Sequence, residues 1–427
     1  MPQSIKQRFQ HVDKVFWVMF FILIGLSIVV LFSASSTLSY HSANSLAPIT
    51  SHVAFLFFGI IVAMVIQFLP SSLMRPVAYL LLFVSFIFLC ATLFPSLPFV
   101  HTINGATRWV SIFGIMFQPA ELAKLSLIIV VADLLVRIKD KESEKKIFFI
   151  IMGITSVVCL LILKENMSTG LLIGGIVFLM LFLGRVNWKY LVGTLAVVAV
   201  LVVGTYLIVE HHYVRQNRTI SGPLHRLPTQ IKRIDKWLFA DKNDITKGEN
   251  DKLFPLSELD GNEYQTTLSH VAVARGGSHF PFGVGPGRSR ERDFLPLAFS
   301  DYIFAIVVEE WGLFGATILI VLYAWILFRA CLKSSSYSDN VAMLMVMGLA
   351  LMITCQALVS MAVSVGILPV TGQPLPLISR GGTSIVITSV YFGILMCVAR
   401  EQNEQKALHE QNIKESYEAV PTINIEE

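Results

Sequence analysis

The chain has 427 residues, of which 54% are hydrophobic and 15% are charged, and its mean hydropathy is +0.67. A soluble domain cannot bury so large an apolar fraction, so the composition excludes an ordinary soluble protein and indicates a polytopic membrane protein. The net charge of +4 comes from cations that flank the apolar segments, and it gives no support for nucleic-acid binding.

Ten apolar stretches approach the length of about 20 residues that a helix needs to cross a bilayer. They predict an all-α polytopic membrane domain over residues 1–400, followed by a cytoplasmic C-terminal tail at 401–427. One large extracytoplasmic loop, residues 210–300, separates spans 7 and 8. The predicted transmembrane helices are 16–33, 53–69, 77–94, 119–136, 147–163, 168–184, 190–209, 302–328, 342–365 and 383–399.

Lysine and arginine are distributed unevenly between the two sides of these spans. They are abundant in inner segments such as 137–146, whereas the short outer loops hold only Arg108, Lys164 and Arg380. By the positive-inside rule both termini are cytoplasmic. The loop 210–300 then lies outside, and its own cations do not contradict this, because long loops cross the membrane largely regardless of charge.

The cysteines lie within or at the ends of the predicted spans, and their spacing matches neither a CxxC motif nor a metal site. We interpret them as small apolar packing residues and predict no metal ligands among them. The five residues are Cys90, Cys159, Cys331, Cys355 and Cys397.

A first polar cluster lies on the outer side, before and at the start of span 4. Arg108 beside Trp109 on an outer turn suits contact with a lipid headgroup or a pyrophosphate. Pro119 suits the start of a helix, and Glu121 and Lys124, three residues apart, share one helix face. The pair fits substrate binding, and it fits equally an ion pair that only neutralises charge near the membrane edge.

The long outer loop contains two predicted helices and a basic segment. Residues 227–239 alternate cations with apolar residues and suit a helix lying on the outer headgroups. A short helix at 268–275 is expected to stop at Gly276 and Gly277. The glycine-rich segment 283–292, which contains Arg288 and Arg290, combines cations with flexible backbone and suits a phosphate-bearing substrate.

Asp301 ends this loop at the threshold of an apolar helix. Partial burial would make such a carboxylate a general base for a sugar hydroxyl. The alternative is an acid that only stabilises the helix N-terminus through the macrodipole. Glu309 and Glu310 follow on the same helix, and at about 100° per residue they do not form one carboxylate pair with Asp301. We expect one of these two glutamates to pair with Lys124 inside the bundle.

The third cluster, residues 366–384, has three prolines and four glycines within 19 residues. This composition predicts an irregular loop at membrane depth, which is tolerated only where it is buried in protein or lines a cavity. Ser379, Arg380 and Thr383 lie where the loop opens into the last span, a place suited to oxyanions.

The three clusters resemble the motifs of the SEDS family (shape, elongation, division and sporulation), the FtsW/RodA group of peptidoglycan polymerases. The resemblance covers residues 15–400. The matching segments are NGATRW at 104–109, FQPAELAKL at 117–125, YQ at 264–265, ARGG at 274–277, FGVGPG at 282–287, LP at 295–296, SDYIFAIVVEEWGLFG at 300–315 and GILPVTGQPLPLISRGGTS at 366–384.

The resemblance implies an enzyme that polymerises lipid II, an undecaprenyl-pyrophosphate disaccharide-pentapeptide, at the outer face of the bacterial cytoplasmic (inner) membrane. Septal synthesis during cell division is favoured over elongation. Asp301 falls in the catalytic motif, and Arg108, Glu121 and Lys124 match essential positions. Further candidates for holding the substrate are Arg288, Arg290, Ser379, Arg380 and Thr383.

The resemblance also implies partners: a class B penicillin-binding protein, which is a transpeptidase, and other membrane proteins of the divisome. A divalent cation, Mg or Mn, can assist the reaction, but no ligand set in the sequence requires one. Two positions depart from the family pattern. Asn166 stands where many members have an acid, and Arg380 stands where a tyrosine is usual.

The alternative function is a lipid II flippase or a non-catalytic lipid-binding scaffold of the divisome or elongasome. A ten-span bundle with a proline-broken cavity and buried charges also suits transport. A translocase, however, needs charges distributed along the depth of its path. This chain concentrates them at the outer rim, which favours the enzyme.

Overall fold

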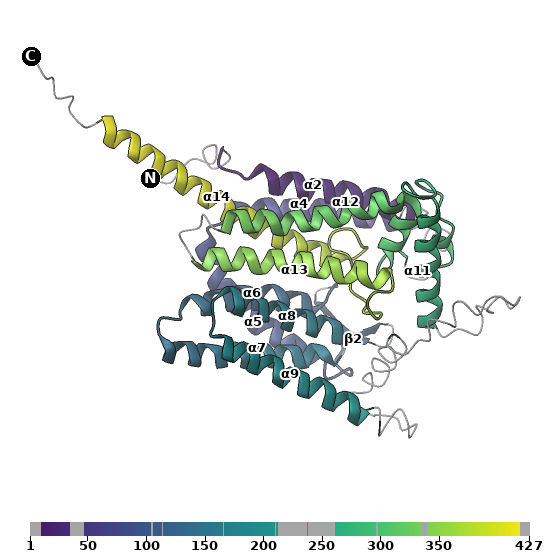
Figure 1. Ribbon diagram of the computed structural model, residues 1–427, viewed down its shortest axis with the longest axis horizontal. Coiled ribbons are helices and arrows are strands. Elements are labelled where there is room, and N and C mark those ends of the chain that lie inside the picture. The colour runs from purple at the N-terminus through teal and green to yellow at the C-terminus, as the bar shows by residue number, and fades with distance from the viewer. Residues whose placement is uncertain are drawn as a thin grey trace, which may run out of the picture.

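The computed structural model describes residues 10–34, 47–103, 106–112, 114–164, 166–209, 211, 237, 261–295, 298–334 and 340–418. They form a bundle of long helices, and helix α11 lies across one end of it (Figure 1). The helices are α2 (Lys14–Ala34), α4 (Ala47–Phe68), α5 (Ser71–Ala91), α6 (Pro119–Val136), α7 (Lys141–Leu163), α8 (Met167–Leu183), α9 (Trp188–Val209), α11 (Gly261–Ser278), α12 (Ile303–Ser334), α13 (Asn340–Ser364) and α14 (Gly382–Glu418).

Eight of the described helices are long and apolar enough to cross a membrane, so the chain is a multi-pass membrane protein. Helix α8 is apolar but has 17 residues, which span about 26 Å at 1.5 Å per residue. Helix α6 has 18 residues and carries Glu121, Lys124 and Asp133. The all-α membrane fold is confirmed, whereas the count of ten spans and the placement of the large loop stay predictions.

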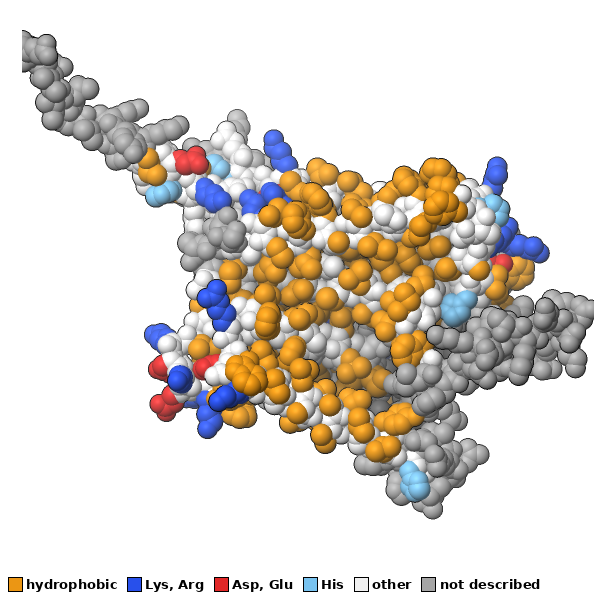
Figure 2. Space-filling model, in the orientation of Figure 1, with side chains coloured by type: hydrophobic (Ala, Val, Ile, Leu, Met, Phe, Trp, Pro, Cys, Tyr) orange, Lys and Arg blue, Asp and Glu red, His pale blue; other side chains and the backbone are white. Residues whose placement is uncertain are grey.

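The sides of the bundle are apolar and its ends are charged. Figure 2 shows hydrophobic side chains over the flanks of the helices, with Lys, Arg, Asp and Glu gathered at the two ends. Leu160 and Phe182 are each 66% exposed on these flanks, an exposure that suits contact with lipid rather than water. In the apolar stretch of each helix, 78% of the residues of α13 are buried but only 6% of those of α9. Helix α13 therefore lies at the centre of the bundle and α9 at its periphery.

A small antiparallel sheet precedes α6, which the sequence did not predict. Its strands are β1 (Val100–Ile103), β2 (Ala106–Ile112) and β3 (Ile115–Phe117), in the order β1-β2-β3. Val110 pairs with Val100 on one side and with Phe117 on the other. The predicted outer turn around Arg108 is therefore strand β2, which packs against α6.

Helix α11 begins at Gly261, earlier than predicted, and ends at Ser278, one residue after the paired glycines. A Cβ on Gly276 would lie 2.0 Å from the backbone oxygen of Val308 in α12. This glycine therefore permits the close approach of α11 and α12. Apart from Trp237, the helix predicted at 227–239 lies outside the described residues.

The start of α2, the end of α12 and the second half of α14 meet at one end of the bundle. Asp13 lies 2.7 Å from Nη2 of Arg329 and 3.2 Å from Nζ of Lys333. Lys333 also donates to Oδ1 of Asn403 at 2.7 Å. Burial raises the pKa of Asp13, but the bonds and charges of Arg329 and Lys333 outweigh it and hold that pKa below its ordinary value. Helix α14 itself runs to Glu418 and so extends into the predicted tail.

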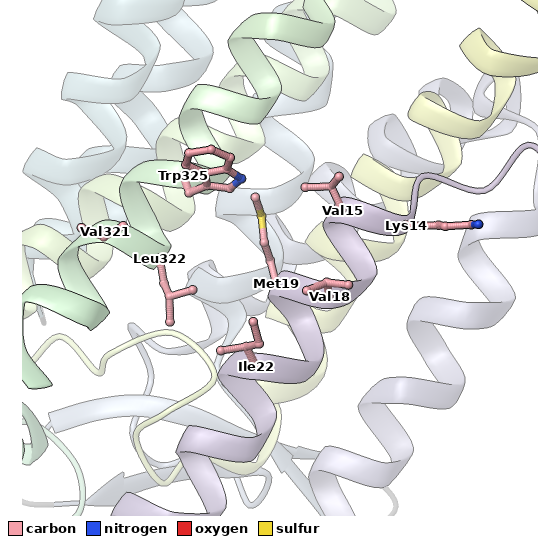
Figure 3. A pocket seen from close by; sticks show the side chains of 8 residues that line it. All are labelled: Lys14, Val15, Val18, Met19, Ile22, Val321, Leu322 and Trp325. Carbon is pink, nitrogen blue, oxygen red and sulfur yellow. The ribbon is translucent and has the colours of Figure 1, made fainter.

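An apolar groove of about 350 Å³ lies between α2 and α12 near this end (Figure 3). Met19 and Ile22 of α2 face Leu322 and Trp325 of α12 across it. Trp325 follows Asp301 by 24 residues along the chain, which is roughly 35 Å at the rise of an α-helix. The groove is therefore separate from the polar residues that the sequence singled out.

Candidate functional site

Asp301 lies in the turn that leads into α12, two residues before Ile303, and is half-buried. Oγ of Ser300 donates a hydrogen bond to Oδ1 of Asp301 at 3.0 Å. Oγ of Ser364, at the end of α13, donates to the backbone oxygen of Asp301 at 3.3 Å. The carboxylate is thus held at the junction of α12 and α13, ahead of the first turn of α12.

Residues 365–381 form the predicted irregular loop, which passes beside this carboxylate. A Cβ on Gly372, whose φ is +64°, would lie 3.5 Å from Oδ2 of Asp301. Oγ of Ser379 donates to the backbone oxygen of Ser300 at 2.6 Å, and N of Arg380 donates to that of Phe299 at 2.9 Å. The loop is therefore attached to the segment that carries Asp301.

Arg380 lies at the end of this loop and is half-buried. Its guanidinium carbon is 5.5 Å from the centre of the Phe299 ring, within the range of a cation–π contact. Burial lowers the pKa of Arg380 from its ordinary value. The group still stays cationic at neutral pH, because an ordinary arginine pKa is so far above 7. Thr383 follows in the first turn of α14, the predicted oxyanion position.

Lys124 is fully buried in α6 and pairs with Glu121 one turn earlier, with 2.7 Å between Nζ and Oε1. Its Nζ also donates to Oε1 of Gln356 in α13 at 3.0 Å. The prediction that Glu309 or Glu310 pairs with Lys124 is wrong. Lys124 finds its acid on its own helix, because residues three apart share a face.

Glu309 and Glu310 instead face the glycine-rich segment that precedes α12. Oε1 of Glu309 lies 2.9 Å from Nη1 of Arg275 in α11, and its two oxygens also accept from Oγ of Ser289 and from N of Arg290. Oε1 of Glu310 lies 3.6 Å from Nη1 of Arg292. Both glutamates are buried, so their pairing with cations offsets a large desolvation cost. The two acids thus fix the basic segment.

Backbone contacts strengthen this attachment at a kink in α12. N of Val284 donates to the backbone oxygen of Glu309, and N of Gly285 donates to that of Glu310, each at 2.9 Å. Gly312, whose φ is +63°, makes the kink. A Cβ there would lie 2.4 Å from the backbone oxygen of Pro281. Only glycine combines this backbone conformation with so close an approach.

Replacement of Gly312 by alanine is expected to lower the thermal stability of the purified protein. The positive φ alone costs about 1–3 kcal/mol for a residue with a Cβ, and the contact with Pro281 adds to it. Gly204→Ala in α9 is the matched control, since nothing lies within 4 Å of a Cβ there, and alanine favours a helix. Equal melting temperatures for the two variants in detergent would contradict this account of the kink.

The structure places the predicted residues in two groups. The first group contains Asp301, Ser379 and Arg380. Lys124 and Glu121 are connected to it through Gln356, whose Nε2 donates a hydrogen bond to the backbone oxygen of Pro374 in the loop at 3.1 Å. The strand with Arg108 packs against α6. Arg288 and Arg290 belong to the second group, where both side chains are exposed on the segment held by Glu309 and Glu310.

Asn166, which departs from the family pattern, caps α8. Its Oδ1 accepts from N of Thr169 at 3.2 Å, as an N-cap residue does. Thr169 in turn accepts a short hydrogen bond from Nε2 of Gln373 in the loop.

The sequence did not single out four residues of the site, because each forms a hydrogen bond or an ion pair with a residue distant in the chain. They are Arg275, Ser289, Gln356 and Gln373. Within the described residues, no group of three or more His, Cys, Asp or Glu is placed to hold a metal ion.

A half-buried carboxylate that accepts a hydrogen bond from a hydroxyl, in a segment bonded to the loop that bears Arg380, suits proton abstraction from an alcohol next to an anionic leaving group. Among solved structures, the chain is similar to a component of a peptidoglycan synthase complex that coordinates polymerization and crosslinking. The TM-score is 0.66 and the identity 23%, over 92% of this chain and 98% of that one. It is also similar to the rod shape determining protein RodA of Thermus thermophilus, with a TM-score of 0.60 and 22% identity over 92% and 97% of the two chains.

Sequence relatives give the same result. The protein named "Probable peptidoglycan glycosyltransferase FtsW" of Thiomonas intermedia is 31% identical over 397 residues, which is 88% of this chain and 86% of that protein. The protein of the same name from Legionella pneumophila is 30% identical over 359 residues, 82% and 81% of the two chains. The family of FtsW, RodA and SpoVE, described as "Cell cycle protein", matches residues 13–404. The chain therefore belongs to the FtsW/RodA/SpoVE family of cell cycle proteins.

Proposed function

We propose that this protein is a peptidoglycan glycosyltransferase that polymerises lipid II into glycan strands at the outer face of the cytoplasmic membrane. The observation that carries this function is the half-buried Asp301 carboxylate, held by Ser300 and bordered by the loop that bears Arg380. The relatives named as FtsW glycosyltransferases support both the activity and a role in septal wall synthesis.

In this reaction Asp301 accepts the proton of the acceptor sugar hydroxyl, and that oxygen attacks the anomeric carbon of the donor. A new glycosidic C–O bond forms, and the bond from that carbon to the pyrophosphate breaks. The electron pair leaves with undecaprenyl pyrophosphate. Arg380 and Arg108 offset the charge that develops on the leaving group, a kind of stabilisation that is strong in a site shielded from water.

We expect no cofactor to be held by the protein itself. A divalent cation that accompanies the pyrophosphate would add to the neutralisation, and chelation by EDTA during turnover measures its contribution. We further propose a class B penicillin-binding protein as the crosslinking partner, together with other divisome membrane proteins at the septum. The similarity to a chain of a synthase complex that coordinates polymerization and crosslinking supports such a partner.

The activity is tested with purified protein and lipid II in detergent, with and without a cognate transpeptidase. Glycan strands longer than the disaccharide are the expected product. The flippase alternative is tested in parallel, by measuring movement of fluorescent lipid II across proteoliposomes. Translocation of lipid II without polymerisation in either preparation would show that the protein acts as a flippase and not as a glycosyltransferase.

The proposed topology places both termini in the cytoplasm and the loop 210–300 outside. Single cysteines at Lys145 and Ser257, in a chain lacking the native cysteines, test it with a membrane-impermeant thiol reagent on intact cells. Lys145 is exposed in the first turns of α7. We expect labelling at position 257, and at position 145 only after the cells are opened. The reverse pattern would invert the topology.

A further inference from the structure

Gln356 in α13 is a buried amide with two partners on different parts of the fold. It is 3% exposed. Its Oε1 accepts from Nζ of Lys124 at 3.0 Å, and its Nε2 donates to the backbone oxygen of Pro374 at 3.1 Å. An ammonium group can only donate and a carbonyl oxygen can only accept. The two ends of the amide are therefore assigned by their partners, and only a side chain that both accepts and donates can serve both.

The Pro374 end of this bridge lies in the part of the loop that borders Asp301. Two residues before it, Gly372 passes beside Oδ2 of Asp301. Five residues after it, Ser379 donates to the backbone oxygen of Ser300. Between these points, Oγ of Ser379 also accepts from N of Leu375 at 2.8 Å. A displacement of Pro374 would therefore move the loop on both sides of the carboxylate.

The Lys124 end of the bridge is a fixed point. Nζ of Lys124 is held by Glu121 as well as by Gln356, and all three side chains are buried. Helix α6 is buried along nearly its whole length, so the ion pair cannot move without repacking the core. The bridge thus connects a rigid helix to a loop that has no regular secondary structure of its own.

We propose that Gln356 is a positioning residue: it ties the loop 365–381 to the Glu121–Lys124 pair and thereby fixes the place of that loop beside Asp301. The role rests on the proposed function of Asp301. Gln356 does not touch the reacting atoms. Its loss acts on the rate, because misplacement of a catalytic group by about 1 Å costs about 10²-fold.

Replacement by glutamate separates the two halves of the bridge. Gln356→Glu keeps an acceptor for Lys124 but removes the donor to Pro374 and sets a carboxylate oxygen against a carbonyl oxygen. Gln356→Met keeps the volume and removes both bonds. Ser360→Ala is the matched control, since Ser360 is buried on the same helix and its Oγ has no hydrogen-bond partner in the described part of the chain.

Two measurements test the role. In lipid II polymerisation we expect Gln356→Glu to lower kcat about 10²-fold with little change in KM, as is typical of a change that spares substrate binding. In hydrogen–deuterium exchange we expect faster exchange in peptides covering residues 365–381, where the amides of Leu375 and Arg380 are bonded. Ser360→Ala should match the wild type in both.

Unchanged exchange in 365–381, or wild-type kcat, in Gln356→Glu would overturn the positioning role. If Gln356→Glu does not accumulate in folded form, the same two measurements on Gln356→Met decide in the same way. The exchange experiment needs no turnover, so it stays informative if the role of Asp301 is wrong. In that case Asp301→Asn is active while the loop still depends on Gln356.

Discussion

Replacement of Asp301 by asparagine is expected to abolish polymerisation while the protein stays folded. Loss of a general base costs about 10²–10⁴ in rate. The fold should survive, because the loop 365–381 and α13 hold this segment through the backbone oxygens of Phe299, Ser300 and Asp301, which the substitution leaves in place. Asparagine also keeps an oxygen that can accept the bond from Ser300.

The measurement is the initial rate of glycan synthesis by purified Asp301→Asn at matched abundance. Asp293→Asn is a suitable control, because Asp293 is an exposed acid of the same connecting segment. Oδ1 of Asp293 lies 3.9 Å from Nε of Arg292, and exposed pairs of this kind contribute about 0–1 kcal/mol. Wild-type synthesis by Asp301→Asn would remove the assignment of a base to this residue.

Replacement of Lys124 by methionine is expected to lower the folded yield sharply as well as the activity. The change leaves the buried carboxylate of Glu121 without its ammonium partner, and breaking a buried pair in this way costs about 3–5 kcal/mol. It also removes the donor to Oε1 of Gln356. Arg137→Met is the control, since Arg137 pairs with Asp133 on the same helix but is 61% exposed.

The double variant Glu121→Gln with Lys124→Met separates folding from chemistry. It removes both charges, so we expect the folded yield and the melting temperature to recover. We expect polymerisation to stay absent, because the double variant still lacks the Lys124 donor to Gln356, through which the loop beside Asp301 is anchored. Recovery of polymerisation together with yield would reduce Lys124 to a structural ion pair.

The amino-acid sequence by itself determined the class of the protein and the character of most segments. Hydropathy is a local property, so helices such as α2, α5, α7 and α13 appear close to where the apolar stretches predict them. Proline and glycine act on their own backbone, so an irregular loop is predicted over 366–384, and the structure has one over 365–381, where α14 begins at Gly382. Motifs placed Asp301 ahead of a helix, as the structure does, and led to the family.

Only the tertiary structure decided which buried polar groups meet. Glu309 faces Arg275 and Ser289 instead of Lys124, and Gln356 bridges α6 and the loop. The sheet around Arg108 likewise forms through pairing of separate strands. The type of a residue is enough to show that its charge, once buried, needs a partner. Which residue becomes the partner depends on which helices become neighbours and on how closely they approach. In this chain the close approach depends on glycines such as Gly276 and Gly312, because their missing side chains permit contacts between backbones far apart in the sequence.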